Sequence, residues 1–187
     1  MLNYNSPIKE NKTYTDLSIK EVEPIMKINL RGNKKEFLTA VDKTLGLILP
    51  NEPNTSTSSE KLTAIWLSPD EWMIFSNNIA EKNNNNYEIE EILYNNISKK
   101  SFGSVTDVTD QFVMINFNGT KIFELFSFGT PFDFSEFKEK KGSTAQTILN
   151  HIDVIIHHKS NHNVNLFVRR SFSEHLWSWI NDCASRL

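Results

Sequence analysis

The sequence of 187 residues contains a single cysteine, Cys183, so no disulfide can form within the chain. It also lacks an apolar run of membrane-spanning length and a basic-then-apolar leader, which predicts a soluble, cytoplasmic protein with no membrane partner. Positive charge is not in excess, because 20 Lys and Arg stand against 23 Asp and Glu, a formal net charge of -3. Without a basic field to hold phosphates, we expect no nucleic-acid partner.

Motifs of common catalytic and cofactor sites are missing as well. The chain contains no G-x-G-x-x-G, no P-loop and no G-x-S-x-G. Cys183 falls on the apolar stripe of a predicted C-terminal helix, which indicates an inert buried thiol rather than a nucleophile. Asp107 and Asp110 bracket a turn, where capping is the commoner role and acid-base catalysis the alternative. We therefore nominate no catalytic and no cofactor-binding residue in this chain.

Three histidines lie close together, at His157, His158 and His162, with Asp153 nearby. Histidine and aspartate side chains can bind zinc and related metals. Neighbouring residues on a strand point to opposite faces, however, so His157 and His158 cannot both reach one ion without a distortion. We expect no metal site here, with a histidine-bound metal as the alternative.

The strongest structural signal is a pair of apolar runs, from about Leu62 to Phe75, that meet at a Ser-Pro-Asp-Glu turn. Proline presets the backbone of a turn, while Ser68 and Asp70 can hydrogen-bond the amides that the turn leaves free. Both flanks are rich in strand-favouring residues, so the stretch predicts a β-hairpin. Whether Trp66 and Trp72 share a face depends on the loop length, which stays open.

Strand and helix patterns alternate on both sides of this hairpin. Before the hairpin, a strand over 26–30 precedes a helix with a capping-box-like start at Asn33 and Glu36 and a stop at Gly46. After the hairpin, the pattern predicts a helix over 87–97 and then strand character over 105–117. This order is that of a split βαβ unit. We expect an α+β fold with helices on one face of the sheet, as a single domain over 21–187. Residues 1–20 have few apolar anchors and predict a flexible N-terminal arm.

The C-terminal half continues with a short helix around Ile122, a long irregular connection over 130–142, and a second hairpin with strands near 152–156 and 164–168. A Ser171–Glu174 capping box predicts the last helix, whose apolar stripe is Phe172, Leu176, Trp179, Ile180, Cys183 and Leu187.

Aromatic residues outside obvious core stripes are the main positive signal for function. Six phenylalanines fall between Phe123 and Phe137, and Trp177 lies off the stripe of the last helix. Such residues are typical of a partner-facing patch, while packing under the long connection is the alternative for the phenylalanines. Two neighbouring arginines could clamp an anion, although strand alternation turns one of them to solvent. The interface candidates are Trp177, Phe128, Phe132, Phe134, Phe137, Arg169 and Arg170.

Five separated motifs together resemble the gamma subunit of heterotetrameric sarcosine oxidase. They are Trp66–Trp72 (WLSPDEW), Asp107–Asp110 (DVTD), Pro131–Phe134 (PFDF), Gly142–Thr147 (GSTAQT) and Arg170–Trp177 (RSFSEHLW). Their order and spacing fit the family from about residue 60 to the C-terminus. Lys121 and Phe134 depart from its pattern, which weakens any inference of a folate pocket in this chain.

The resemblance implies a fold related to the folate-binding aminomethyltransferase domain, and alpha, beta and delta subunits as partners, mainly alpha. It implies a complex that oxidises sarcosine to glycine, passes the one-carbon unit to tetrahydrofolate and forms hydrogen peroxide. FAD, FMN, NAD, tetrahydrofolate and zinc are then expected in the partner subunits and none in this chain. We interpret the chain as a non-catalytic structural subunit. A stand-alone folate-binding or aminomethyltransferase-like module, and an unrelated α+β binding module, are the alternatives.

Overall fold

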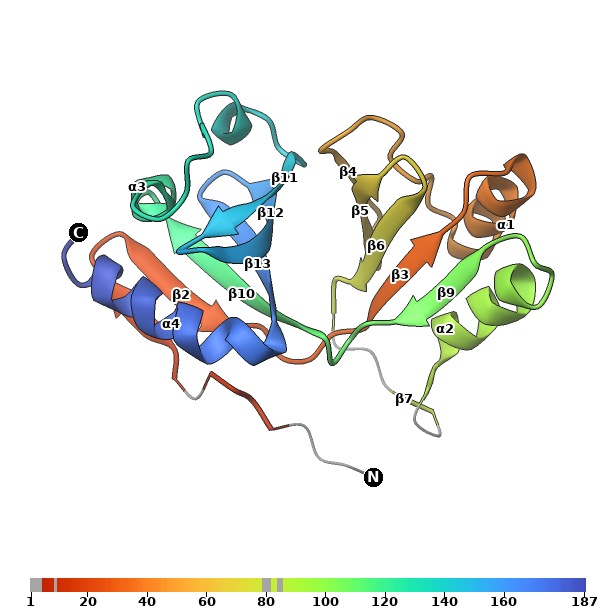
Figure 1. Ribbon diagram of the computed structural model, residues 1–187, viewed down its shortest axis with the longest axis horizontal. Coiled ribbons are helices and arrows are strands. Elements are labelled where there is room, and N and C mark those ends of the chain that lie inside the picture. The colour runs from red at the N-terminus through yellow and green to blue at the C-terminus, as the bar shows by residue number, and fades with distance from the viewer. Residues whose placement is uncertain (1–4, 9, 79–81, 84–85) are drawn as a thin grey trace. The chain divides into compact units, whose positions relative to one another are not determined.

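The computed structural model describes residues 5–8, 10–78, 82–83 and 86–187. The chain divides into two compact units (Figure 1). Unit 1 is formed by Pro24–Asp110, and unit 2 by the N-terminal segment up to Glu23 together with Gln111–Leu187. The sequence predicted a single domain over 21–187. The chain instead divides where the predicted strand region 105–117 is interrupted by its polar turn, because the strands on either side join different sheets.

Unit 1 contains the split βαβ order that the sequence predicted. Its elements are β3 (Lys27–Arg31), α1 (Lys35–Leu45), β4 (Ser56–Ser58), β5 (Leu62–Ser68), β6 (Glu71–Ser76), β7 (Lys82–Asn83), β8 (Asn86–Tyr87), α2 (Glu88–Leu93), the π-helical turn η1 (Tyr94–Ser98) and β9 (Ser104–Asp107). The main sheet has the antiparallel order β4-β5-β6-β3-β9, which is the split arrangement with β4 added at one edge. The two-stranded β7-β8 ladder is separate.

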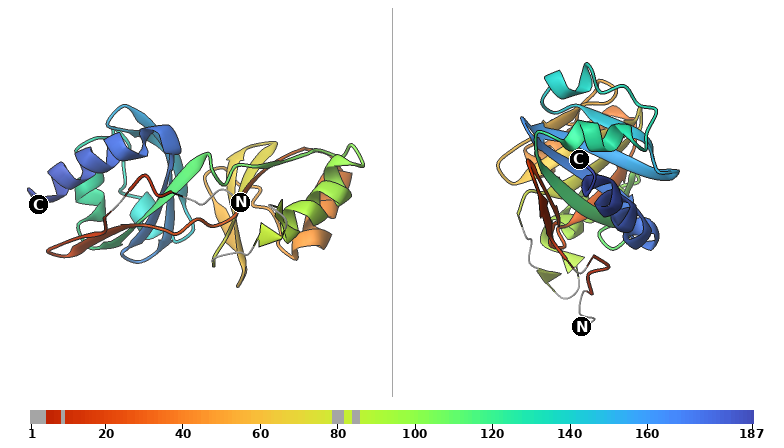
Figure 2. Two further views of the ribbon diagram at one scale, coloured as in Figure 1. Left: turned by 90° about the horizontal axis from the view of Figure 1, so that it is seen from below. Right: turned by 90° about the vertical axis from the view of Figure 1, so that its left-hand side faces the viewer.

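The helices of unit 1 cover one face of its sheet, as predicted. Phe37 and Val41, four residues apart on α1, and Leu93 and Ile97 from α2 and η1 join the buried core formed by strand side chains. Figure 2 shows α1 and α2 lying side by side. Helix α1 ends at Gly46, which adopts the left-handed conformation and donates its N–H to the carbonyl of Asp42 (2.8 Å).

The hairpin β5-β6 forms as predicted, and its register decides the placement of the two tryptophans. Trp66 pairs directly with Trp72 across the strands, so both side chains lie on the same face, and a bulge between Trp66 and Ser68 absorbs the extra loop residue. Trp72 is buried, stacks on Phe37 with ring centroids 5.9 Å apart, and donates its indole N–H to the Pro50 carbonyl (2.8 Å).

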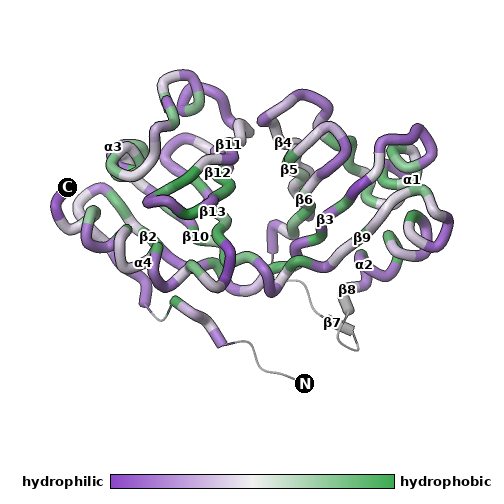
Figure 3. Tube along the Cα trace, in the orientation of Figure 1, coloured by the Kyte–Doolittle hydropathy of each residue, from purple (hydrophilic) through white to green (hydrophobic). Residues whose placement is uncertain are grey.

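Unit 2 is built on a six-stranded antiparallel sheet with the order β1-β2-β10-β13-β12-β11. Its elements are β1 (Lys12–Tyr14), β2 (Leu17–Glu21), β10 (Phe112–Gly119), α3 (Ile122–Ser127), the 3-10 turn η2 (Phe137–Glu139), β11 (Thr144–Leu149), β12 (Ile152–Ser160), β13 (Asn163–Arg169) and α4 (Arg170–Ala184). The second predicted hairpin is β12-β13. Hydrophobic residues concentrate on these two strands (Figure 3), and side chains from α3 and α4 complete a core with one face of the sheet.

The N-terminal residues that the sequence predicted as a flexible arm are strands in the structure, with residues 1–4 and 9 lying outside the described part. Residues of β2 pair with β10 from Leu17↔Gly119 to Glu21↔Ile115. Leu17 and Ile19 are buried in the core of unit 2. Because successive strand residues face opposite sides, two apolar residues separated by one position were enough to anchor this short segment.

The predicted capping boxes are wrong at both helices. Helix α1 begins after Lys34 and α4 after Arg169, and neither N-cap side chain makes a capping hydrogen bond. On α4 the buried positions are Ser173, Leu176, Ile180 and Ala184, so the predicted stripe is shifted at its start, where Phe172 is 49% exposed. Among the described residues, no helix combines the length and apolarity that crossing a membrane requires.

Candidate functional site

The phenylalanines of the segment between α3 and β11 pack mainly against one another. Phe134 and Phe137 are both only 6% exposed, and their ring centroids lie 5.7 Å apart. Phe123, Phe132 and His158 surround them at centroid distances of 5.0 to 6.0 Å. Edge-to-face packing of this kind is typical of a core. The packing alternative therefore describes Phe134 and Phe137, while Phe132 is half-buried at the margin of the cluster.

Phe128 differs from this cluster because it is 57% exposed at the end of α3. The chain turns immediately after it at Gly129, where a Cβ atom would lie 2.4 Å from the Trp179 ring. An exposed phenylalanine on a fixed helix end is a side chain that a partner can contact.

Trp177 on α4 is half-buried and packs against the core of unit 2. Its carbonyl accepts a hydrogen bond from the Asn181 amide (2.7 Å), and the Asn181 side-chain oxygen in turn accepts one from the Tyr14 hydroxyl (2.8 Å). Helix α4 and the β1-β2 hairpin are therefore tied together on the side of the helix where Trp177 lies.

The two arginines at the junction of β13 and α4 have different environments, with Arg169 ending the strand and Arg170 beginning the helix. Arg169 is exposed, and its guanidinium lies 5.9 Å from the centre of the Phe112 ring. Arg170 is half-buried and donates to the backbone carbonyl of Asn5. Arg170 thus fastens the N-terminal segment, while Arg169 is available at the surface.

The histidines point in opposite directions, as predicted. His158 lies on the helix-covered face, where its Nδ1 is 2.9 Å from the Lys140 carbonyl oxygen. His157 lies on the other face and is buried; burial, then the charges of His158 and Lys159, lowers the pKa of its imidazole to about 4. Among the described residues, no group of three or more His, Cys, Asp or Glu is placed to hold a metal ion.

Asp107 and Cys183 have structural environments. The Asp107 carboxylate accepts the Thr109 backbone N–H (2.8 Å), which is the turn-capping role. Cys183 is half-buried, and burial followed by the charge of Asp182 raises the pKa of its thiol.

Sequence reasoning missed a buried polar row on the face of the unit 2 sheet opposite its helices. Asn116, Asn165 and His157 are cross-strand neighbours there. The Asn116 amide donates to the side-chain oxygens of both Asn163 and Asn165 (2.8 Å each). The signal available in the sequence was an asparagine inside each of the apolar strands β10 and β13, since burying an amide requires partners.

Lys27 at the start of β3 is also buried, at 2% exposed, and was missed. Its ammonium donates to the carbonyls of Ile25 (3.2 Å) and Thr109 (3.4 Å). Its backbone N–H donates to the Thr109 hydroxyl (2.9 Å). These bonds join β3 to the residues that follow β9, so Lys27 helps to define the end of unit 1.

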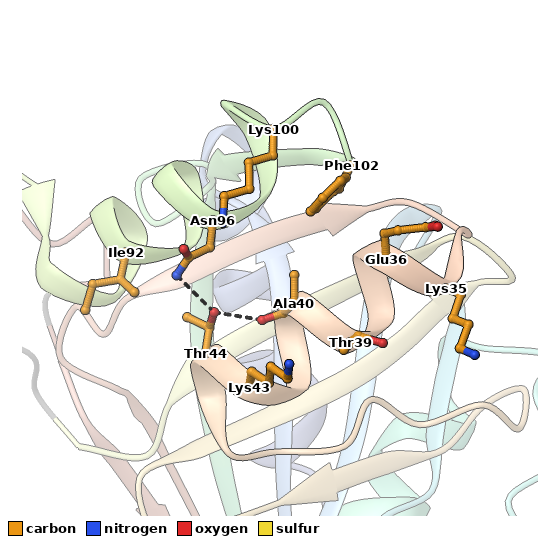
Figure 4. Close-up of a pocket in the computed structure, with 10 residues that line it drawn as sticks. All are labelled: Lys35, Glu36, Thr39, Ala40, Lys43, Thr44, Ile92, Asn96, Lys100 and Phe102. Carbon is orange, nitrogen blue, oxygen red and sulfur yellow. Dashed lines mark hydrogen bonds between the residues drawn. The ribbon is translucent and has the colours of Figure 1, made fainter.

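Two surface grooves flank α1. The first lies between α1 and α2–η1, has a volume of about 660 Å³, and is lined by Lys35, Lys43, Asn96, Lys100 and Phe102 among others (Figure 4). The second, of about 750 Å³, lies on the side of α1 towards the 46–53 loop and is lined by Leu38, Ile48, Pro53 and Trp66 among others. Leu38 and Ile48 are exposed, so this groove is largely apolar.

Comparison with protein families finds one match. Residues 31–186 match the family described as Sarcosine oxidase, gamma subunit family. The match covers most of unit 1 and nearly all of unit 2 after its N-terminal strands. A comparison with curated proteins finds no match.

Solved structures with the same fold include two enzymes. A chain of heterotetrameric sarcosine oxidase from Corynebacterium sp. U-96, in complex with pyrrole 2-carboxylate, matches with a TM-score of 0.80 and 20% identity over 91% of this chain and 84% of that chain. Glycine cleavage system aminomethyltransferase T from Bartonella henselae matches with a TM-score of 0.55 and 12% identity over 88% of this chain and 45% of that chain. At these identities the likeness shows the fold, which this chain shares with part of the aminomethyltransferase.

Proposed function

Because the chain belongs to the sarcosine oxidase gamma subunit family, we propose that it is a structural subunit that holds the oxidase together and carries no catalytic centre of its own. The family match over residues 31–186 carries this proposal. Asp107 and Cys183, which were considered for chemistry, have structural environments, and this supports the non-catalytic role.

The chemistry of the complex then belongs to the other subunits. We propose alpha, beta and delta subunits as partners, with alpha as the main contact, and FAD, FMN, NAD, tetrahydrofolate and zinc as their cofactors. The assembled enzyme oxidises sarcosine to glycine, transfers the one-carbon unit to tetrahydrofolate and forms hydrogen peroxide in the cytoplasm. The residues that we propose at the contact are the exposed Phe128 and Arg169 and the half-buried Phe132, Trp177 and Arg170.

Co-expression with and without this chain tests the proposal. A tagged alpha subunit is purified after co-expression of all four chains or of the three others alone, and the mass of the complex and its sarcosine-dependent peroxide production are measured. We expect a stoichiometric four-chain complex, and loss of assembly when this chain is omitted. If the other three assemble and react normally without it, the proposal fails, and folate binding by the isolated chain becomes the next measurement.

Trp177→Ala probes the proposed contact directly. The side chain is half-buried, so its outer part is free to contact a partner. We expect at least tenfold weaker assembly with a loss of unfolding free energy below about 2 kcal/mol, since only part of the ring is buried. Urea unfolding and complex mass measure the two effects. A loss of stability above about 3 kcal/mol with unchanged assembly would instead make Trp177 a core residue.

A further inference from the structure

The groove between α1 and α2–η1 is the strongest unassigned feature of unit 1. Lys35 and Lys43 lie on α1 eight residues apart, which separates their backbones by about 12 Å along the helix axis. Lys100 extends from the opposite rim towards Asn96 (Figure 4). With Glu36 as the one acidic lining residue, the groove carries a formal excess of two positive charges.

These charges are not neutralised within the described part of the chain. None of the ion pairs found there includes Lys35, Lys43 or Lys100. The whole chain has a formal net charge of -3, so the groove is a local reversal of its overall sign. Electrostatic complementarity therefore favours a ligand segment that carries carboxylates at this groove.

The floor of the groove offers both polar and apolar contacts. The Asn96 amide donates to the Thr44 hydroxyl (3.3 Å), which itself donates to the Ala40 carbonyl (2.7 Å), so Asn96 is held in place. Asn96 lies on the π-helical turn η1, a local irregularity that is frequent at functional sites. Ile92 is 41% exposed beside it. Figure 4 shows Ile92 at one end of the groove, so the lining combines charged lysines with an exposed apolar side chain, as protein contacts do.

We propose that this groove docks an acidic segment of another subunit of the oxidase, with carboxylates at the three lysines and an apolar side chain on Ile92. The inference rests on the proposed function. A single small anion does not fit the pattern, because the ammonium groups of Lys35 and Lys43 lie apart and do not point to a common position (Figure 4). A segment of about eight helical or four extended residues spans the distance of about 12 Å between their backbones.

Charge reversal in the assembled complex tests this inference. The triple variant Lys35→Glu, Lys43→Glu, Lys100→Glu is co-expressed with tagged partner subunits, and its dissociation constant is measured from 50 to 500 mM NaCl. We expect at least tenfold weaker binding at 50 mM NaCl and a flatter salt dependence than in the wild type, since attraction between exposed charges is screened by salt. A second set with Lys→Gln at the same three positions should give an intermediate effect. It avoids a glutamate in the last turn of α1, where a negative charge would destabilise the helix itself.

The control carries the same charge change elsewhere. Lys20→Glu, Lys61→Glu, Lys159→Glu alters three exposed lysines that belong neither to the groove nor to the connection that carries Phe132, and should bind within twofold of the wild type. Binding of both groove sets at the wild-type level, or equal weakening by the control, would overturn the groove as the docking site while leaving the subunit role intact. Failure of the wild-type chain to join any complex would instead overturn the proposed function.

Discussion

At the scale of single residues, Phe128 and Phe134 have the same side chain six positions apart and opposite environments. Phe134 contacts the rings of Phe123, Phe126, Phe132 and Phe137, whereas Phe128 is 57% exposed. The sequence placed both among the interface candidates because composition alone does not show which rings a connection folds inward. Only the packing of the connection against α3 and β12 separates them.

This difference gives a matched pair of variants. Phe134→Ala should lower the unfolding free energy by about 3–5 kcal/mol, because it opens a cavity in a buried aromatic cluster. Phe128→Ala should change it by less than about 0.5 kcal/mol, because the ring is mostly in water. Urea unfolding of the two purified chains measures both. Equal losses would contradict the assignment of Phe128 to the surface.

His157 should make stability depend on pH. Burial holds the pKa of its imidazole at about 4 in the folded chain, below the ordinary value of 6.5. The unfolded chain therefore binds more protons between these values, and stability that is complete above pH 6.5 falls as the pH drops towards 4. The total loss is about 3 kcal/mol, at about 1.4 kcal/mol for each pKa unit. Urea unfolding from pH 4 to 7 measures it.

The variant His157→Gln removes this ionisable group and should flatten the slope between pH 6.5 and 4. His175→Gln, at an exposed position of α4, is the control and should leave the wild-type slope in place. A wild-type slope in His157→Gln would assign the pH dependence to other groups.

At the scale of elements, hydrophobic periodicity predicted most helices and strands, while end signals were less reliable. The split βαβ order, both hairpins and the Gly46 stop are confirmed. The capping boxes at Asn33 and Ser171 are not, because the N-cap residues are Lys34 and Arg169: Asn33 precedes its N-cap, and Ser171 lies inside α4. The β1-β2 strands were missed, since three to five residues with two apolar anchors give too short a pattern.

The junction of β2 and β10 depends on Gly119. Its φ is +143°, and a Cβ atom there would lie 2.0 Å from the Asp16 carbonyl oxygen. Gly119→Ala should therefore destabilise the chain by at least about 2 kcal/mol, because the obstructing atom is backbone and the conformation is strained for an L-residue. Thermal and urea unfolding measure the loss.

Gly46→Ala is the control for this close approach. Gly46 also has a positive φ, at +59°, but nothing lies within 4 Å of its Cβ position. The expected loss is about 1 kcal/mol from the left-handed conformation alone. A loss as large as that of Gly119→Ala would show that backbone conformation, rather than the contact with Asp16, sets the cost.

At the scale of the whole molecule, the division into two units was the largest feature that sequence reasoning did not predict. The sequence predicts strand character over 105–117 around a polar turn and does not indicate that the two strands belong to different sheets. Local patterns cannot show that β9 pairs with β3 while β10 pairs with β2 and β13, because these partners are distant in sequence. The two grooves beside α1 could not be predicted from the sequence for the same reason, because each is lined by residues that only tertiary packing brings together.

Unit 1 is formed by one continuous segment, whereas unit 2 is formed by two segments that are separate in the sequence. This difference predicts how fragments of the chain should fold. The core of unit 1 lies entirely between Met26 and Val105, within one continuous segment. Unit 2 requires Leu17 and Ile19 from β2, without which the long strand β10 becomes an unpaired edge. A fragment of residues 24–110 should therefore fold cooperatively, whereas residues 111–187 should aggregate or remain unfolded.

Joining residues 5–23 to 111–187 through a short Gly-Ser linker should restore folding of unit 2. The connection is short because the Val22 N–H donates to the Met114 carbonyl (2.8 Å), which brings the two cut ends close together. Circular dichroism and urea unfolding of the three fragments measure these outcomes. If residues 111–187 fold as stably alone as with residues 5–23 attached, the N-terminal strands are dispensable. A domain with its own complete core is expected to fold alone. If residues 24–110 stay unfolded, unit 1 therefore needs contacts with the rest of the chain.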